Sequence, residues 1–241
     1  MIKIKEYELQ TKLLYDRMTS IWPNDPWYNY THNVIKRFIY SHKDVFEKKH
    51  CILNAGSGGE CYDGIKGTIY HVDISDRFIK TLPKSYVASV EHLPFEESFF
   101  DIVICVGSVV NYCDILFAIS EFNRVLKPGA YLFLEYERSQ TGELFLKEQY
   151  GSYATIQVYK YNNQDNHKLW LYSDSYVNQI LSAYSFCTLD CELFHSLSAL
   201  SNRFIKCDKR AGRFTKLERF VLPSIQKSVA HNRILLCRKL S

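Results

Sequence analysis

The chain has 241 residues, of which 46% are hydrophobic, 15% aromatic and 23% charged, and its formal net charge at pH 7 is +4. This composition predicts a globular protein that forms a single domain over residues 1–241, and it argues against a disordered chain. The sequence has no run of about 18 apolar residues, and its first residues lack the apolar segment of a signal peptide. We therefore expect a cytoplasmic protein without a membrane span.

The positive charge is concentrated near the C-terminus. Residues 201–241 contain eleven Lys and Arg residues and only two acidic residues, so the first 200 residues carry a net charge of −5. A basic segment of this kind either attracts an anionic substrate, a nucleic acid or a membrane, or it is the solvated face of a helix. The eight cysteines follow neither a metal-binding nor a disulfide pattern. We expect no metal and interpret them as small buried hydrophobic residues.

The N-terminal part predicts two helices ahead of the first strand. Apolar residues recur near helical spacing in residues 6–20 and again in residues 31–49. Between these stretches, residues 22–33 contain two prolines and four aromatic residues. We expect these aromatic side chains either to pack against the core or to cover a pocket.

A glycine-rich loop follows the first predicted strand. Residues 51–53 form an apolar run typical of a buried strand, and residues 54–59 (Asn-Ala-Gly-Ser-Gly-Gly) let the backbone turn sharply and approach a ligand. Residues 67–72 predict a second strand that ends at Asp73, whose carboxylate can accept hydrogen bonds from both hydroxyls of a ribose. This order predicts a site for a nucleoside-bearing cofactor.

The rest of the chain continues as alternating helices and strands. The middle part predicts a helix at 76–82, a strand at 85–90, a strand at 101–106, a helix at 114–126 and a strand at 130–136. The C-terminal part predicts an added hairpin at 153–172, a helix at 173–184 and two further strands at 186–194 and 231–237. Between the last two strands lies the long basic insertion, residues 195–230, which we expect to be functional or to contain its own helices.

The motifs in residues 51–137 occur in an order that resembles the class I S-adenosylmethionine (SAM)-dependent methyltransferases. They are the glycine-rich loop, Asp73, the stretch 92–113 that contains LPFEESFFDIVICVGS, and the stretch 121–137 that contains RVLKPG. The resemblance implies an α/β fold with a doubly wound, mostly parallel, Rossmann-like sheet of seven strands. Its sixth and seventh strands would be antiparallel to each other at one edge. It further implies a helical cover in residues 1–49, a SAM-binding core in 50–137 and a C-terminal half in 138–241 that holds the hairpin and the insertion.

The resemblance also assigns residues to the cofactor. It implies SAM contacts at Tyr28, Asn54, Ala55, Gly56, Ser57, Gly58, Asp73, Ile74, Ser89, Val90, Glu91, Val106 and Gly107. In related enzymes the N-terminal segment folds over the pocket, so Trp27, Tyr28 and Tyr30 would cover the cofactor. The sequence departs from the family at three positions, because Asn54 and Ser89 replace acidic residues and Glu60 replaces a glycine.

Methyl transfer is an in-line displacement that mainly requires positioning and the exclusion of water. Asn111 and Tyr112 follow the fourth predicted strand and His195 ends the sixth, so these three are our candidates for positioning the acceptor or removing its proton. The aromatic segments indicate an enclosed pocket, which favours a small-molecule acceptor, and the basic segment is compatible with an anionic one.

Three alternatives remain open. A nucleic acid is the second candidate acceptor, although the sequence has no known nucleic-acid-binding module. A SAM-binding protein without catalysis is suggested by Asn54 and Ser89. An NAD(P)-dependent oxidoreductase would also use a glycine-rich loop and a downstream acid, but its third glycine is absent here.

Overall fold

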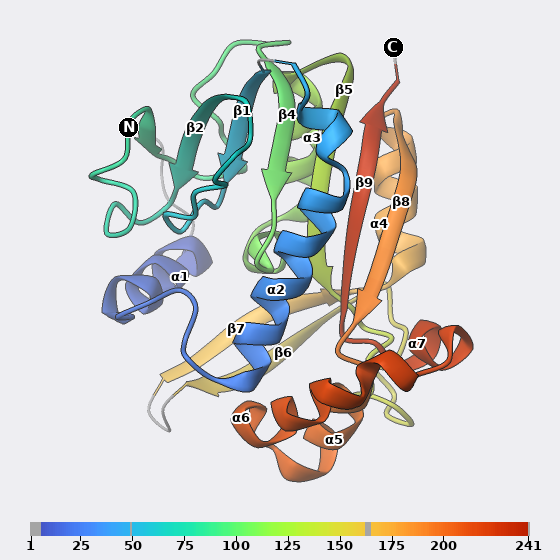
Figure 1. The fold of residues 1–241 in the computed structure, drawn as a ribbon. Helices are drawn as coiled ribbons and strands as arrows, with labels where there is room; N and C mark the ends of the chain where they lie inside the picture. The colour runs from blue at the N-terminus through green and yellow to red at the C-terminus, as the bar shows by residue number, and fades with distance from the viewer. Residues whose placement is uncertain (1–5, 49, 162–164, 241) are drawn as a thin grey trace.

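The computed structural model describes residues 6–48, 50–161 and 165–240, and over these residues the main structure is a single seven-stranded sheet flanked by helices (Figure 1). The strand order is β3-β2-β1-β4-β5-β9-β8. The first five strands of this order are parallel, and β9 is antiparallel to both β5 and β8. The expected doubly wound, mostly parallel sheet is confirmed.

The strands of the main sheet are β1 (His50–Ala55), β2 (Gly67–Asp73), β3 (Ser85–Val87), β4 (Phe100–Cys105), β5 (Leu126–Glu137), β8 (Phe186–Phe194) and β9 (Asn232–Lys239). A separate two-stranded hairpin consists of β6 (Ala154–Tyr161) and β7 (Asp165–Tyr172). The α-helices are α1 (Glu6–Arg17), α2 (Pro26–Ser41), α3 (Ile115–Val125), α4 (Asp174–Ala183), α5 (Leu197–Ile205), α6 (Asp208–Ala211) and α7 (Pro223–Val229). The 3₁₀ helices are η1 (Lys43–Phe46), η2 (Val109–Tyr112) and η3 (Gly212–Phe220).

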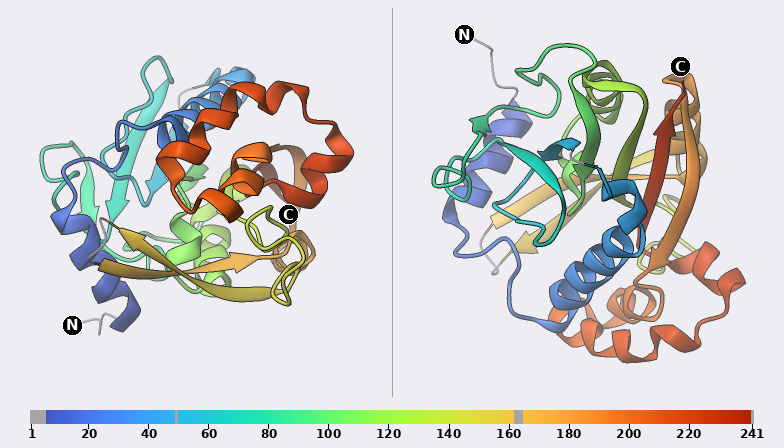
Figure 2. Two further views of the ribbon diagram at one scale, coloured as in Figure 1. Left: turned by 90° about the horizontal axis from the view of Figure 1, so that it is seen from below. Right: turned by 45° about the horizontal axis from the view of Figure 1, so that its top comes forward.

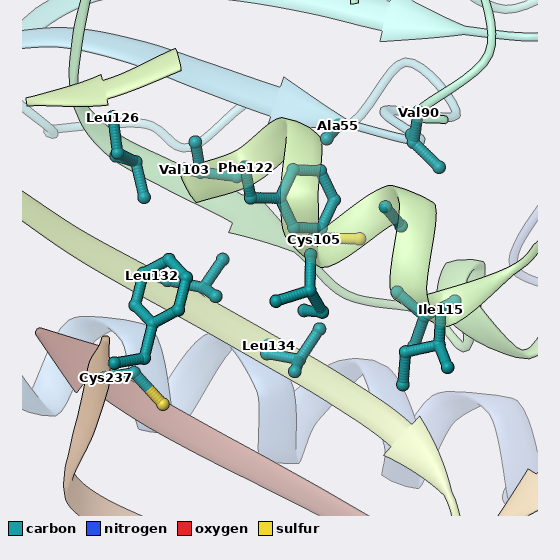
Figure 3. Packing of buried hydrophobic residues seen from close by; sticks show 14 of the residues in the cluster. Ala55, Val90, Val103, Cys105, Ile115, Phe122, Leu126, Leu132, Leu134 and Cys237 are labelled. Atoms are coloured by element: carbon teal, nitrogen blue, oxygen red, sulfur yellow. The ribbon is translucent and has the colours of Figure 1, made fainter. Parts of the chain in front are cut away.

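Helices cover both faces of the sheet, which explains why its central strands are continuous apolar runs. Residues 102–105 of β4 are fully buried. Apolar side chains of α2 pack on one face together with Ile52 and Ile104. Side chains of α3 and α4 pack on the other face, where Phe122 lies among residues of β4 and β5 such as Leu132 (Figure 3).

Helix α2 begins earlier than expected. The apolar pattern predicted a helix over 31–49, but α2 begins at Pro26 because the Asp25 carboxylate accepts hydrogen bonds from the backbone N–H groups of Trp27 (2.9 Å) and Tyr28 (3.2 Å). An Asp followed by Pro is a strong start signal for a helix. Trp27, Tyr28 and Tyr30 therefore occupy the first turns of α2, whereas Trp22 precedes the helix.

Two short predicted elements differ in the structure: one is not a helix, and the other is a shorter strand. The helix expected at 76–82 is a series of turns, in which the N–H groups of Ile79 and Lys80 both donate to the Asp76 carbonyl. Pro83 follows this segment and disfavours a helical backbone at the residue before it, so the turns cannot continue into a longer helix. The strand expected at 85–90 ends at Val87, and Ser89 turns the chain by accepting a hydrogen bond from the N–H of Glu91 (3.1 Å).

The N-terminal helix, the hairpin and the C-terminal insertion all gather at one edge of the sheet. Figure 1 shows α1, β6–β7 and α5–α7 at the end to which β1, β2 and β4 point, and Figure 2 shows them around that edge from below. The insertion contains helices, as expected. None of the helices that the structure describes combines the length and the apolar character needed to cross a membrane.

The cysteines are only partly the buried residues that we expected. Cys105, Cys113 and Cys237 are buried, whereas Cys61, Cys187 and Cys191 are exposed. Cys187 and Cys191 lie on β8, which is the last strand of the sheet and leaves one side to solvent.

Candidate active site

A cavity of about 740 Å³ lies at the edge of the sheet where the parallel strands end. Its wall includes residues of α1 and α2, the loop after β1, the ends of β2 and β5, the segment after β4, the hairpin and the insertion. Segments far apart in the sequence therefore enclose one space, and the carboxyl edge of an open α/β sheet is where such folds bind ligands.

The glycine-rich loop forms one side of this cavity. Gly56 and Gly58 have φ angles of +70° and +51°, a backbone conformation that residues with a side chain rarely adopt. A Cβ on Gly56 would lie 2.3 Å from a Val109 methyl, and one on Gly58 would lie 2.4 Å from Ile21. The loop thus requires glycine for its conformation and for the close approach of its neighbours.

Asp73 joins the end of β2 to the glycine-rich loop. Its carboxylate accepts hydrogen bonds from the backbone N–H groups of Gly58 (2.8 Å) and Ser75 (2.9 Å). Burial raises the pKa of Asp73, while these hydrogen bonds act in the opposite direction. The residue lines the cavity, as does its neighbour Ile74.

Asn54 and Glu60, the two residues of this loop that depart from the family pattern, both stabilise it. The Asn54 amide donates to the Glu60 carbonyl (2.9 Å) and to the Ser57 hydroxyl (3.2 Å). The Glu60 carboxylate lies 2.8 Å from Lys36 Nζ and 2.9 Å from His32 Nε2, both on α2. Glu60 therefore fixes α2 over the loop, a role that its place in the sequence did not reveal.

A carboxylate of α1 lies beside Ser89, where the family usually has an aspartate. The Ser89 hydroxyl donates to Glu8, which is only 5% exposed and lines the cavity. Glu91 lies outside the cavity wall, which corrects our expectation of a cofactor contact, because its buried carboxylate accepts from Tyr7 and from the N–H of Asp114 (2.7 Å).

The segment after β4 is held by a buried carboxylate. Glu135 accepts from the backbone N–H groups of Gly107 (2.9 Å) and Ser108 (2.6 Å) and from the Asn232 amide (2.7 Å). Complete burial raises the pKa of Glu135 to about 7, even though these donors favour its ionised form. The network fixes the backbone of Val106–Ser108 on the cavity wall.

Eleven of the thirteen predicted cofactor residues line the cavity: Tyr28, Asn54, Gly56, Ser57, Gly58, Asp73, Ile74, Ser89, Val90, Val106 and Gly107. Ala55 lies outside the wall, like Glu91, because its side chain is fully buried in the core against the sheet. Trp27 lines the cavity with Tyr28, whereas Tyr30 lies outside it and packs against Phe194 and His195.

Of the two candidates that follow β4, only Tyr112 lines the cavity. Burial raises the pKa of its phenol well above the usual value, so it remains protonated near neutral pH. Asn111 is fully buried, and its amide is used within the fold: it donates to the carbonyls of Glu137 (3.0 Å) and Trp170 and accepts from the N–H of Glu137 (2.9 Å). Asn111 ties η2 to β5 and β7, which corrects the expectation that it acts on the acceptor.

His195, the third candidate, lies in the core rather than on the cavity wall. Its side chain is fully buried, stacks on Trp27 with ring centroids 4.0 Å apart, and lies 2.8 Å from both the Thr31 and the Ser198 hydroxyl. Burial lowers its pKa well below the usual value, so the ring is neutral. His195 joins α2 to the insertion and does not line the cavity.

An acidic group that was not among the predicted site residues lines the end of the cavity beneath the insertion. Glu137 lies 3.1 Å from His231 Nε2, and the other nitrogen of that ring lies 2.9 Å from the Thr141 hydroxyl. The Asn202 amide donates to Glu143 (2.7 Å) as well as to Asp208. These residues come from β5, the loop after it, the insertion and the start of β9, so no local pattern links them.

The acidic side chains of this group change the pKa values of His231 and Asp208. Burial lowers the pKa of His231, but the neighbouring Glu143 and Glu137 outweigh burial and raise it to about 9. Burial, together with Glu143, raises the pKa of Asp208 to about 6. Within the described residues, no group of three or more His, Cys, Asp or Glu side chains is arranged to hold a metal ion.

The comparisons with known proteins agree with this arrangement. Residues 53–134 match the family model described as a methyltransferase domain. The chain therefore contains a methyltransferase domain in this region. The match covers the region from β1 to β5 and so includes the glycine-rich loop, Asp73 and the segment after β4.

The methyltransferase domain also resembles proteins of known sequence or structure. A tRNA U34 carboxymethyltransferase from Campylobacter curvus is 35% identical over 69 residues, which are 27% of this chain and 23% of that protein. The match therefore spans less than a quarter of the length of that curated relative.

Two crystal structures illustrate the similarity in fold. One is a 1,6-didemethyltoxoflavin-N1-methyltransferase from Burkholderia thailandensis with bound 1,6-didemethyltoxoflavin and S-adenosylhomocysteine, with a TM-score of 0.60, 12% identity and coverage of 97% of this chain and 88% of that one. The other is a SAM-dependent methyltransferase from Mesorhizobium loti, with a TM-score of 0.54, 11% identity and coverage of 83% and 97%. At these identities the comparison shows the fold of the methyltransferase domain.

The sheet topology distinguishes this domain from the oxidoreductase alternative. A dinucleotide-binding Rossmann domain has six parallel strands in the order 3-2-1-4-5-6. Here the antiparallel strand β9 is inserted between β5 and β8. Together with the family match, this topology disfavours an NAD(P)-dependent enzyme.

Proposed function

We propose that this protein is a SAM-dependent methyltransferase that transfers a methyl group to a small-molecule acceptor by in-line displacement. The observation that carries the proposal is the single cavity of about 740 Å³ that runs from Asp73 and the glycine-rich loop to the acidic group at its other end. One space of this kind can hold a cofactor and an acceptor together, which is what a direct transfer requires.

The residues of the cavity fit SAM. Asp73 would accept hydrogen bonds from the ribose hydroxyls, and the loop at Gly56–Gly58 would lie against the methionine part. Trp22 supports this fit, because its indole Nε1 is buried without a hydrogen-bond partner in the described chain and the residue lines the cavity. A buried donor of this kind indicates a missing acceptor, and the carboxylate of SAM would provide one.

Glu8 would replace the aspartate that usually contacts the adenine amine. Ser89 donates its hydroxyl to Glu8, which holds this carboxylate at the cavity wall beside Val90. A carboxylate accepts hydrogen bonds only, so it suits an amine donor. Helix α1 would therefore contribute to cofactor binding as well as covering the site.

The protein's part in the reaction would be to position the reactants and exclude water. Bound SAM would supply a methyl group made electrophilic by the adjacent sulfonium. Glu135 would keep the wall at Gly107 and Ser108 rigid, while α1, α2 and the insertion would cover the cavity. An enclosed site of this kind favours a small molecule over an extended polymer.

Calorimetric titration of the purified protein with SAM, S-adenosylhomocysteine and NADH in parallel tests the cofactor. We expect both adenosyl ligands to bind and NADH to give no signal. Transfer of labelled methyl from SAM to a panel of acceptors then tests catalysis. Binding of NADH alone would contradict the proposal, and binding of SAM without transfer to any acceptor would favour a noncatalytic SAM-binding protein.

An RNA acceptor is the second candidate. The similarity to a tRNA-modifying enzyme favours it, and so do the exposed basic side chains of the insertion, which are Lys206, Lys209, Arg210, Arg213, Lys216, Arg219 and Lys227. Binding of tRNA should then weaken steeply as salt increases, because phosphate contacts release counterions. Methylation of tRNA at a rate above that of every small molecule tested would replace the small-molecule proposal.

A further inference from the structure

Building on the proposed methyltransferase function, we propose that the acceptor is an amine that also carries an anionic group, with its nitrogen bound between Asn232, Glu137 and the Glu143–Asp208 pair. The acceptor nitrogen would then be the methylated atom.

The first observation is an unpaired acceptor atom at Asn232. This residue is 3% exposed and lines the cavity, and its amide nitrogen donates to Glu135 (2.7 Å). Its Oδ1 is buried and has no hydrogen-bond partner among the described residues. A buried carbonyl oxygen left unpaired costs stability, so it indicates a ligand that donates a hydrogen bond.

The position of Asn232 suits the reacting atom. Asn232 pairs with Glu137 across β9 and β5, and Glu135 connects it to the backbone of Gly107 and Ser108. An amine N–H bound to Asn232 would therefore lie beside the segment after β4. An amine has N–H groups to donate to Asn232 and to the carboxylates nearby, whereas an ether or ketone has none.

The second observation is a group of acidic side chains on the cavity wall. His231 is paired with Glu137 at 3.1 Å, and its ring also interacts with Glu143 and Asp208, so one histidine faces three carboxyl groups. Glu143 and Asp208 both accept from the single amide nitrogen of Asn202, at 2.7 and 2.8 Å, which brings two acidic groups together on the cavity wall. A protonated amine would compensate this charge. The raised pKa of Asp208, about 6, reflects the same crowding of acidic groups.

The third observation concerns the anionic group. Arg203 also lines the cavity, and its Nη1 is buried without a hydrogen-bond partner in the described part of the chain. Arg203, Lys147 and Lys206 all line this cavity, and none of the three forms an ion pair within the described residues. A guanidinium in this state fits a carboxylate or phosphate on the acceptor.

Methyl transfer would begin with the loss of a proton from the acceptor. The bound ammonium group gives one proton to Asp208, which later releases it to solvent, and the neutral amine lone pair then forms the new C–N bond to the methyl carbon. The C–S bond breaks, its electron pair stays on sulfur, and S-adenosylhomocysteine and an N-methylammonium product result. An acid with a pKa near 6 can take this proton and return it to solvent near neutral pH.

The test uses glycine, alanine, phenylalanine and tyrosine, each compared with its α-hydroxy acid and its decarboxylated amine. Titration with S-adenosylhomocysteine comes first, because failure to bind it would count against the proposed function and not against the choice of acceptor. With that binding established, we expect N-methylation within at least one series and no methylation of its hydroxy acid. Equal or faster methylation of the hydroxy acids, or no methylation of any amine, would overturn the proposal.

Variants separate charge recognition from folding. Glu143→Gln and Asp208→Asn should each lower kcat/KM for the amine at least about tenfold while the affinity for S-adenosylhomocysteine stays unchanged. Arg203→Gln should raise KM for the amino acid but not for its decarboxylated amine. Glu148→Gln removes an exposed charge close by in the sequence and serves as the matched control. Unchanged kinetics in both acidic variants would contradict the proposal.

Discussion

Asp73 allows the proposed cofactor site to be tested at a single residue. Its carboxylate accepts hydrogen bonds from the backbone of Gly58 and Ser75, and the residue lines the cavity. Asp73→Ala should weaken SAM binding by about 1–3 kcal/mol, since ribose donors lose their acceptor and two backbone donors lose theirs. Calorimetry measures the change directly. Asp76→Ala, at an exposed position three residues later, should have no effect, and an unchanged affinity in Asp73→Ala would place the nucleoside elsewhere.

Glu8 allows a sharper test, because the proposed contact is with one group of the adenine ring. The wild-type protein should bind S-adenosylhomocysteine more tightly than S-inosylhomocysteine, which lacks the amine, by about 1.5–3 kcal/mol. Glu8→Ala should remove most of this preference, whereas Glu6→Ala, an exposed change on the same helix, should keep it. A preference that persists in Glu8→Ala would show that another group binds the adenine amine.

At the scale of elements, Arg138 connects the end of β5 to α4 and α7. Its side chain is 1% exposed, pairs with both Asp174 oxygens at 2.9 and 2.8 Å, and donates to the Lys227 and Ala230 carbonyls. This position anchors the elements that flank the acidic end of the cavity.

Arg138→Ala should lower the free energy of unfolding by about 3–5 kcal/mol, because it leaves buried carbonyls and a carboxylate without their donor. Arg138→Lys should recover little of this stability, since an ammonium group cannot form the same bidentate contact with Asp174. Urea unfolding gives the values. Arg37→Ala, which breaks an exposed ion pair with Glu192, should cost about 0–1 kcal/mol, and similar losses for Arg37 and Arg138 would contradict this account.

At the scale of the whole molecule, the buried ion pair of His231 makes stability depend on pH. The folded pKa of about 9 lies above the ordinary value of 6.5, so the protonated ring stabilises the fold below pH 6.5, and this contribution is lost as pH rises through 9. The loss should reach about 3 kcal/mol.

Urea unfolding at several pH values between 6.5 and 9.5 measures this loss. The raised pKa values of Asp208 (about 6) and Glu135 (about 7) mean that their ionisation lowers stability mostly below this window. His231→Gln should flatten the curve above pH 6.5. A slope that is the same in the variant would assign the pH dependence to other groups.

The sequence alone determined the parts of the fold that depend on local chemistry. The apolar strands, the glycine turn after β1 and the end of β2 at Asp73 were predicted correctly, because apolar runs and a positive φ at glycine are properties of a few adjacent residues. Likewise the seven-stranded sheet followed from the order of the motifs and their resemblance to a known family. Boundaries were less accurate, as the early start of α2 shows, because a cap such as Asp25 can extend a helix beyond its apolar pattern.

Only the tertiary structure decided which polar side chains meet in the cavity and in the core around it. Ser89 and Glu8 are 81 residues apart in the sequence, and Thr31 and His195 are 164 apart, so no local pattern could predict either contact. Packing placed His195 in the core and brought acidic residues of β5, the following loop and the insertion together around His231. Such sites depend on long-range contacts, and these form only when the sheet, α1, α2 and the insertion close around the same edge.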